Sequence, residues 1–155
     1  MRDAEFPAFF KAASNSYARD NAATGRWTEN DAPVLASEEL KRLLPLGEKT
    51  PDHYLFVLHD PSAAADVGYM WYATQARATS RVAFLFQLYV HEQSRRQGYG
   101  RQALVAFEHH ALDTGHNSLA LNVFATNSGA LRLYEAAGYS PTSIGMRKLP
   151  ARSAA

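Results

Sequence analysis

The sequence predicts a single α/β domain of the α+β type, with about four helices around one central sheet. Three β-rich runs, at 54–58, 67–73 and 82–90, follow one another with turn residues between them. This order is typical of an antiparallel meander. Helical periodicity precedes and follows the meander, over about residues 6–23 and 100–112. With 155 residues and 46% hydrophobic content, the chain can bury one core but has no room for a second large domain.

Composition excludes several classes of function. Sixteen Lys and Arg residues balance fifteen Asp and Glu residues, so no long-range field favours nucleic acid or an anionic membrane. The chain has no cysteine, which excludes disulfides, a thiol nucleophile and zinc–thiolate sites. The N-terminus is polar and no apolar run reaches membrane length. We therefore expect neither a signal peptide nor a spanning helix, and a cytoplasmic location is the default.

The first two predicted helices precede the meander. Apolar side chains recur at intervals of three and four residues over about 6–23, which predicts an amphipathic helix that Gly25 ends. Its apolar stripe consists of Phe6, Phe9, Phe10, Ala13 and Tyr17. Ser37, followed by two glutamates, predicts the cap of a second helix that runs to Leu44.

Downstream of the meander the pattern is helix, strand, helix. After the helix at about 100–112, residues 119–124 form an apolar run that predicts the next strand. Asn127 or Ser128 caps the following helix, which Gly138 terminates.

The last segment of the chain is expected to add one strand and a tail. Residues 144–149 predict a final strand, and residues 150–155 predict a frayed C-terminal tail. The domain is accordingly expected to span residues 1–149.

A basic turn containing two glycines, Arg95-Arg96-Gln97-Gly98-Tyr99-Gly100, joins the central strand to the long helix. The first turn of a helix has unpaired N–H groups and the positive end of the macrodipole, so it binds anions. Gly98 and Gly100 lack the side chains that block close approach of a phosphate, and Arg95, Arg96 and Arg101 add charge. A solvent-exposed glycine turn with surface arginines is the alternative. The strand before and the helix after favour a diphosphate site.

Two motifs together resemble one family. Arg95-x-x-Gly98-x-Gly100 is similar to the signature of the GNAT superfamily of acetyl-coenzyme-A-dependent N-acetyltransferases, which reads Gln or Arg, two residues, Gly, any residue, Gly or Ala. Residues 119–139 look like the family's next strand and its asparagine-led helix. They end in the family's closing motif, which reads tyrosine, any three residues, glycine and an aromatic residue. Two matches in this order are more specific than either alone. The clear resemblance covers residues 82–148.

The resemblance implies a mixed, mostly antiparallel sheet and a defined reaction. The protein would transfer an acetyl group from acetyl-coenzyme A, its co-substrate, to a primary amine of a small molecule or peptide. The amine would attack directly in a ternary complex, without a metal. The main chain of Leu88 and Val90 is then expected to pair with the pantetheine arm. The pyrophosphate is expected at Arg95, Arg96, Gln97, Gly98, Tyr99, Gly100 and Arg101.

The resemblance also gives individual residues a role. Asn127 corresponds to the asparagine that hydrogen-bonds the cofactor arm, although a plain helix cap explains it equally well. Tyr134 corresponds to the tyrosine that protonates the departing thiolate, and a core tyrosine on an apolar helical face is the alternative. Trp27, Gln87 and Tyr89 are expected beside the acceptor. For Trp27 the alternative is a structural role, in which its ring covers the edge of the core.

The sequence departs from the family in two places. The helical pattern begins within a few residues of Met1, so the family's first strand is missing or vestigial. The strand near Tyr54 would then have an exposed edge, which the C-terminal tail or a second subunit in a homodimer would cover. Residues 86–90 contain no carboxylate to serve as a base. The amine proton is therefore expected to leave through water, or through His91 or Glu92 at the end of the strand.

Other functions remain as alternatives. The six histidines show no spacing typical of a metal site, and we expect no metal. A non-catalytic acyl-coenzyme-A-binding domain, acting as a sensor or interaction module, fits the same motifs. A weaker alternative is a nucleotide-binding module that uses only the turn at 95–100. Acceptor-dependent release of thiol distinguishes an enzyme from the binding modules.

Overall fold

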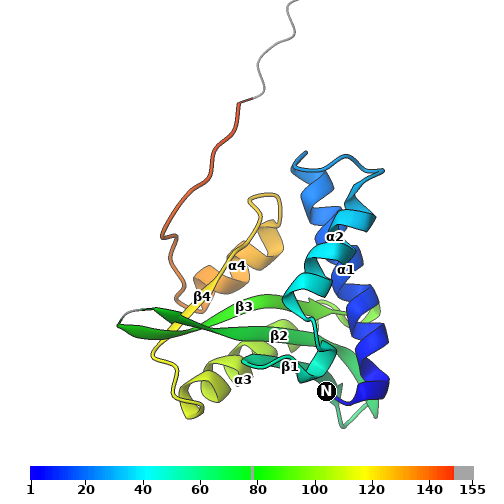
Figure 1. Ribbon diagram of the computed structural model, residues 1–155. Coiled ribbons are helices and arrows are strands. Elements are labelled where there is room, and N and C mark those ends of the chain that lie inside the picture. Colours follow the sequence, from blue (N-terminus) through cyan, green and yellow to red (C-terminus); the bar gives the residue numbers. More distant parts are fainter. Residues whose placement is uncertain (78, 149–155) are drawn as a thin grey trace, which may run out of the picture.

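A computed structural model describes residues 1–77 and 79–148 (Figure 1). It is a four-stranded sheet with four α-helices, and the predicted fold class is confirmed. The helices and strands, in chain order, are α1 Phe6–Ala23, α2 Ala32–Leu43, β1 His53–Asp60, β2 Ala65–Arg77, β3 Ser80–Val90, α3 Tyr99–Asp113, β4 Ser118–Leu121 and α4 Ser128–Ala136. Short 3-10 turns lie at Asp3–Glu5, Gly47–Lys49 and Glu92–Ser94.

The sheet has the order β1-β2-β3-β4. β1 pairs with β2 and β2 with β3 in antiparallel fashion, as the meander predicts. β4 returns beside β3 in parallel, because α3 carries the chain across the sheet between them. β3 is therefore an interior strand with neighbours on both sides, which agrees with its nearly continuous apolar sequence.

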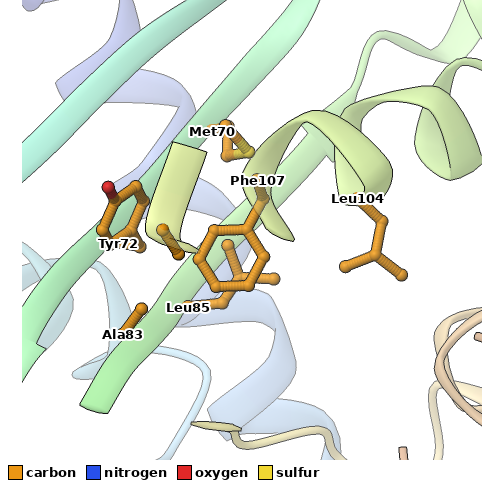
Figure 2. Close-up of a cluster of buried hydrophobic side chains, with 7 residues drawn as sticks. Met70, Tyr72, Ala83, Leu85, Leu104 and Phe107 are labelled. Atoms are coloured by element: carbon orange, nitrogen blue, oxygen red, sulfur yellow. The ribbon is translucent and has the colours of Figure 1, made fainter. Parts of the chain in front are cut away.

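Helices cover both faces of the sheet. On one face α1 and α2 pack with Phe9 and Leu40 against Leu55 and Trp71. On the other face α3 packs onto Met70, Tyr72, Ala83 and Leu85 (Figure 2). The α3 side chains in this second core, shown in the same view, include Leu104 and Phe107. Partly buried residues of α4 pack against the α3 side as well.

Buried polar groups fix the C-terminal end of α3 on the sheet. The Tyr72 hydroxyl lies 2.6 Å from His110 Nδ1. His116 is almost fully buried, with Nε2 2.9 Å from the Thr74 hydroxyl and Nδ1 3.0 Å from the Ala111 carbonyl. Because a carbonyl only accepts, Nδ1 of His116 donates to Ala111, and this ring links the end of α3 to β2.

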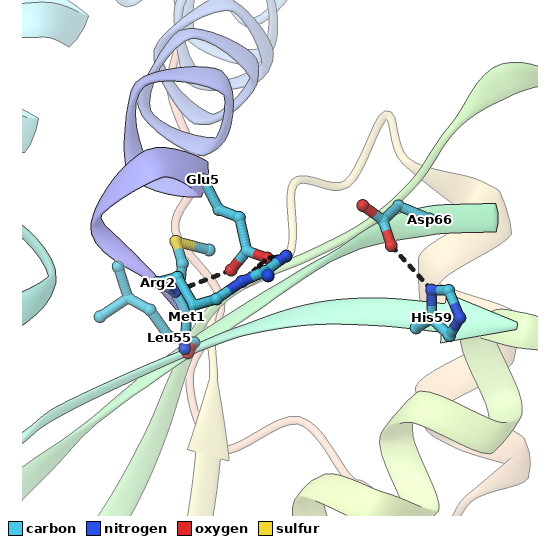
Figure 3. A network of polar contacts seen from close by, with 6 residues as sticks. All are labelled: Met1, Arg2, Glu5, Leu55, His59 and Asp66. Atoms are coloured by element: carbon cyan, nitrogen blue, oxygen red, sulfur yellow. Dashed lines mark hydrogen bonds and ion pairs between the residues drawn. The ribbon is translucent and has the colours of Figure 1, made fainter. Parts of the chain in front are cut away.

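The N-terminal segment reaches the outer edge of β1, where the sequence predicts an exposed strand. The described chain has no strand before α1. Instead the amino group of Met1 donates to the Leu55 carbonyl at 2.9 Å (Figure 3). Arg2 pairs with Glu5 beside it, through a backbone N–H and its guanidinium. The N-terminal segment thus covers part of this edge without forming a strand.

Three boundaries differ from the sequence predictions. α2 begins at Ala32 rather than Ser37, because Pro33 fits the first helical turn and the Thr28 hydroxyl bonds Asp31 just before it. β4 ends at Leu121, where the chain leaves β3. Residues 144–148 are extended but pair with no strand of the described chain, so the predicted last strand is wrong over these residues. Leu149 and the predicted tail at 150–155 lie outside the described residues.

Membrane-spanning helices were searched for in the described residues. None of the described helices is both long enough and apolar enough to cross a bilayer.

Candidate functional site

The site lies where β3 and β4 separate. The two strands pair only from Val82 with Ser118 to Leu85 with Leu121. Beyond this point β3 continues to Val90 along β2, whereas the chain after β4 turns toward α4. One edge of residues 86–90 is therefore left without a strand neighbour in the described structure. Backbone groups on such an edge can bind an extended ligand.

A β-bulge increases this separation. Trp71 of β2 faces Gln87, but its neighbour Tyr72 faces Leu85, so Phe86 is an extra residue in β3. The Phe86 ring stacks on Trp71 with ring centres 4.5 Å apart, on the α1–α2 side of the sheet. The bulge bends β3 and anchors it by this aromatic stack.

The alternation of the β2–β3 ladder tells which amides face the open edge. The N–H of His91 donates to Val67, so the odd-numbered residues Tyr89 and Gln87 also direct their N–H groups toward β2. Leu88 and Val90 direct theirs away from β2, toward the side from which β4 has departed. These two residues are the ones whose main chain the resemblance to the family would pair with the pantetheine arm.

The turn after β3 has an unusual backbone. Arg96 and Gly98 both adopt positive φ, 64° and 86°, and Gly98 is the N-terminal cap of α3. Turns with left-handed residues of this kind form concave N–H surfaces that bind anions. A side-chain Cβ at Gly98 would meet only the Gln102 amide nitrogen, at 3.8 Å, so the space in front of this backbone is open. A phosphate can approach closely here.

A strong hydrogen bond holds the turn against the sheet. The Tyr99 hydroxyl donates to Asp60 at the end of β1, at 2.5 Å. This bond and the contacts from Ser62 lower the pKa of the Asp60 carboxyl to about 2, and the same carboxylate raises the pKa of Tyr99. The first residue of α3 is thereby fixed to a second element of the sheet.

The basic side chains of the turn have different surroundings. Arg95 donates to the Val90 carbonyl at 3.1 Å and lies over the Tyr89 ring, so it braces the end of β3. Arg96 is exposed and lines the cavity beside the turn. Gln97 bonds the carbonyl of residue 93, and neither it nor Arg101 lines that cavity. Arg19 and Arg95 also line this cavity, so the charge available to a ligand comes from these two residues and Arg96.

Two adjoining cavities occupy the separation between β3 and α4. The first, of about 660 Å³, runs from the basic turn along Leu88, Tyr89 and Val90. The second, of about 540 Å³, lies between α1, α2 and the bulged part of β3, and Gln87 lines it. The residues that line both cavities are Ser16, Asp20, Leu88, Asn127, Ala130 and Tyr134.

Tyr134 and Asp20 lie at the junction of the cavities. Burial raises the pKa of the Tyr134 phenol, which keeps it protonated at neutral pH. Burial also raises the pKa of the Asp20 carboxyl, against the opposing effect of Arg19. A proton donor and a proton acceptor thus line the same small region, where a ligand in one cavity meets a ligand in the other.

Asp20 is the site residue that sequence reasoning missed. It continues the spacing of the aromatic stripe on α1, three residues after Tyr17, at a position where an apolar side chain is expected. A carboxylate on the inward stripe of an amphipathic helix was the available signal. His91 and Glu92, which the sequence suggested as bases, line neither cavity.

Two further predicted residues have structural contacts. The Asn127 side chain caps α4, because its Oδ1 accepts from the N–H of Ala130 at 3.1 Å, and its amide nitrogen remains as a donor beside the cavities. Trp27 lines neither cavity; its ring packs edge-on against Tyr17, with centres 5.3 Å apart. Tyr17 itself lines the second cavity, so Trp27 stands behind that wall.

The second cavity carries charge of both signs. Asp20 and Glu39 face it together with Arg26, and the aromatic rings of Trp71 and Phe86 form part of its wall. Within the described residues, no three His, Asp or Glu side chains are grouped as metal ligands.

Comparison with known proteins agrees with this geometry. Residues 15–139 match the acetyltransferase (GNAT) family. The chain therefore belongs to that family and is a GNAT-type N-acetyltransferase, which confirms the resemblance seen in the sequence. Members of the family use acetyl-coenzyme A as co-substrate and act on amine acceptors.

Relatives in Bacillus subtilis match over almost the whole chain. The uncharacterized N-acetyltransferase YycN is 32% identical over 148 residues, which are 96% of this chain and 94% of that protein. The uncharacterized N-acetyltransferase YdgE is 30% identical with the same coverage. The crystal structure of YycN superposes with a TM-score of 0.91 over 97% of this chain and 95% of that one.

Proposed function

We propose that this protein transfers the acetyl group of acetyl-coenzyme A to a primary amine of a small molecule or peptide, by direct attack in a ternary complex. The observation that carries the proposal is the pair of cavities that meet at Tyr134 and Asp20. One cavity begins at a basic turn with an anion-binding backbone, and the other is separately lined by polar and aromatic side chains. Two substrates can therefore lie end to end with their reacting groups at the junction.

Coenzyme A would occupy the first cavity, which begins at the basic turn and follows Leu88, Tyr89 and Val90. Its diphosphate would bind the N–H groups of the turn near Gly98, with Arg96 neutralising charge. The amide-rich pantetheine arm would extend the sheet along the N–H groups of Leu88 and Val90. Asn127, which lines both cavities, would offer its amide nitrogen to the same arm from the start of α4. Coenzyme A supplies an activated thioester, and the protein supplies its position at the junction.

In the proposed reaction the amine nitrogen bonds to the thioester carbonyl carbon, and the carbon–sulfur bond breaks. The acceptor must first lose a proton from its ammonium group, and Asp20 would accept it. Tyr134 would donate its phenolic proton to the departing thiolate. Attack leaves one surplus proton on the nitrogen of the adduct, and this proton would pass through solvent to the Tyr134 phenolate, which restores the phenol and yields the neutral amide. We favour Asp20 over His91 and Glu92, the two bases suggested by the sequence, because Asp20 lines the junction and His91 and Glu92 do not.

Most of the rate enhancement is attributed to positioning. Holding a free amine against a bound thioester makes a bimolecular step effectively unimolecular, which is worth on the order of 7–11 kcal/mol in favourable cases. The aromatic stack of Phe86 on Trp71 holds the middle of β3 against β2, and the bond from Tyr99 to Asp60 holds the start of α3 against β1. The geometry of the pair of substrates is then set by the sheet.

A substrate screen tests the proposal. Acetyl-coenzyme A is incubated with the protein and with sets of small amines, polyamines, aminoglycosides and peptide N-termini, while free thiol is measured. We expect thiol release that depends on one acceptor class and saturates in both substrates. Tight binding of coenzyme A without acceptor-dependent release in any class would instead identify a non-catalytic binding domain.

A further inference from the structure

The indole of Trp71 forms part of the wall of the second cavity and belongs to the core beneath α1 and α2. Only 3% of the residue is exposed to solvent. An indole has one polar hydrogen and accepts no hydrogen bond, so its N–H needs an acceptor when the ring is buried. In this protein the acceptor is a histidine, because the N–H of Trp71 donates to Nδ1 of His53 at 2.9 Å.

Each strand of the meander contributes one ring to this group. His53 is the first residue of β1, Trp71 lies in β2, and Phe86 is the bulged residue of β3. The ring centres of His53 lie 5.7 Å from Trp71 and 6.1 Å from Phe86, with planes inclined by 29° and 27°. Trp71 and Phe86 line the second cavity and His53 does not. His53 therefore supports the aromatic wall from behind.

The bond between the two rings requires one protonation state of His53. Nδ1 accepts the indole proton only through a free lone pair, so the imidazole is neutral and carries its proton on Nε2. Protonation of His53 places a second N–H on Nδ1, which then faces the N–H of Trp71. The hydrogen bond is lost, and a buried donor is left without its partner.

The surroundings of His53 place this change in mildly acidic solution. Burial lowers the pKa of the imidazole, and the negative charge of Asp52, the preceding residue, opposes this effect. The rings of Trp71 and Phe86, which face His53 from β2 and β3, do not titrate. The charged side chains that line the cavity are Asp20, Arg26 and Glu39. His53 is thus neutral at pH 7 and takes up its proton below the ordinary histidine pKa of about 6.5.

We propose that His53 is a positioning residue for the second cavity, which holds the indole of Trp71 in the wall while neutral and releases it when protonated. The acceptor amine is then bound best at neutral and alkaline pH and less well in mild acid. This consequence for the acceptor rests on the proposed function, whereas the state of the indole does not. Because protonation and binding oppose each other, a ligand that needs the ordered wall also disfavours protonation of His53.

The indole resonance of Trp71 tests the proposal in the protein alone. The chain has two tryptophans, so Trp27→Phe leaves Trp71 as the single indole in ¹H–¹⁵N spectra. A hydrogen-bonded N–H proton resonates downfield of a free one. We therefore expect the Nε1–H resonance to move upfield as pH falls below about 6.5, with the same midpoint as the ring protons of His53. Circular dichroism should stay unchanged over this range.

Substitutions in the Trp27→Phe protein separate the hydrogen bond from the ring. His53→Asn offers an acceptor that does not titrate, so the Trp71 resonance should stay downfield at every pH. His53→Phe keeps a ring without an acceptor, so the resonance should lie upfield at every pH. His59→Asn is the matched control, because His59 is an exposed histidine of the same strand that contacts Asp66 (Figure 3). It should leave the titration unchanged. A Trp71 resonance that ignores pH with His53 present, or that still responds in His53→Asn, would overturn the proposal.

Kinetics test the consequence for the acceptor, with acetyl-coenzyme A and an acceptor found in the substrate screen. Ionisation of Asp20 and of the amine affects the natural protein and His53→Asn alike, so the ratio of their KM values for the acceptor isolates His53. This ratio should rise roughly fivefold or more between about pH 8 and about pH 5.5, while the ratio of kcat values stays constant. A constant KM ratio would refute the effect on the acceptor. Absence of turnover with every acceptor would reject the proposed function and leave the spectroscopic result to decide the role of His53.

Discussion

Tyr134 combines packing and chemistry in one side chain, and its hydroxyl can be removed without changing the ring. Tyr134→Phe is expected to lower kcat by roughly 10²-fold or more, the usual effect of losing a general acid. Affinity for coenzyme A and the thermal midpoint should stay close to those of the natural protein. Steady-state kinetics and calorimetry measure these quantities.

The control for this variant is Tyr139→Phe. The Tyr139 ring lies 5.9 Å from that of Tyr134, but its hydroxyl is buried without a hydrogen-bond partner in the described structure. Removing an unsatisfied buried hydroxyl should leave kcat unchanged and should not lower stability. Equal activity of both variants would show that Tyr134 is structural.

Asp20 should reveal itself in the pH dependence of the reaction. Its carboxyl must be ionised to accept a proton, and burial raises its pKa, so kcat/KM should rise as pH increases through that raised pKa. Asp20→Asn should remove this limb and lower turnover by about 10²-fold. Glu39→Gln, in the same cavity wall, is the control and should keep the limb. A pH profile unchanged by Asp20→Asn would exclude the carboxylate as the base.

The same substitution should stabilise the fold. A carboxyl whose folded pKa lies above its unfolded pKa favours folding most when protonated, and this contribution is lost as pH rises through the folded pKa. Near neutral pH the natural protein therefore carries a buried charge that Asp20→Asn removes. A higher thermal midpoint together with lower turnover is the expected combination, typical of a residue retained for catalysis.

The basic turn offers a comparison between two arginines. Arg96 lines the first cavity and Arg101 does not, although both are exposed and five residues apart in sequence. Arg96→Ala should weaken coenzyme A binding by about tenfold, the loss of roughly 1.4 kcal/mol for one charge-assisted contact. Arg101→Ala should change it little. Titration calorimetry at fixed salt measures both affinities, and an equal loss in the two variants would contradict this prediction.

The sequence marks candidate site residues but does not specify their surroundings. The glycine turn, Asn127 and Tyr134 are visible because motif spacing marks them. Asp20 was missed because one carboxylate on a helix gives no local sign that it faces a cavity. Whether Arg96 or Arg101 faces the ligand depends on the left-handed backbone at Arg96, which sequence patterns do not specify.

At the scale of elements, the start of α3 depends on β1. Tyr99 donates to Asp60, and the depressed pKa of this carboxyl means that its ionised form favours the fold. The contribution is fully present above the unfolded pKa of about 3.9 and is lost as pH falls toward about 2. Tyr99→Phe should move the pKa of Asp60 upward and weaken coenzyme A binding, because α3 loses its anchor.

The pKa of Asp60 can be followed by NMR titration in both proteins. Ser62→Ala is the matched control, since Ser62 contacts the same carboxylate without touching α3. It should raise the pKa of Asp60 without changing coenzyme A affinity. If both variants weaken binding equally, the link between Asp60 and the turn is not what positions α3.

Element boundaries show where sequence patterns fail. α1, β3 and α3 match their predicted ranges because apolar periodicity is strong over many residues. α2 begins before Ser37 because a proline that looks like a breaker sits in the first helical turn. Residues 144–148 have the composition of a strand, yet composition does not specify whether a sheet edge is available to pair with them.

At the scale of the molecule, the opening between β3 and β4 lies between the two parts of the domain, and a ligand bound in it would contact both. α1 and α2 cover one face of the sheet and α3 with α4 the other, and both halves line the cavities. The meander, the crossover and the order of the elements can be predicted from the sequence. The divergence beyond Leu85 does not, because it arises from the bulge at Phe86 and from the departure of the chain after Leu121.

Hydrogen exchange can detect this opening directly. Without ligand, the amides of Leu88 and Val90 face the unpaired edge and should exchange much faster than those of Gln87 and Tyr89, which face β2. Coenzyme A should slow exchange at Leu88 and Val90 selectively, because the pantetheine arm would accept their hydrogen bonds. Gln87 and Tyr89 serve as internal controls in the same strand. Uniform protection of all four amides would indicate general stabilisation by a ligand bound elsewhere, and would remove the β3 edge from the binding site.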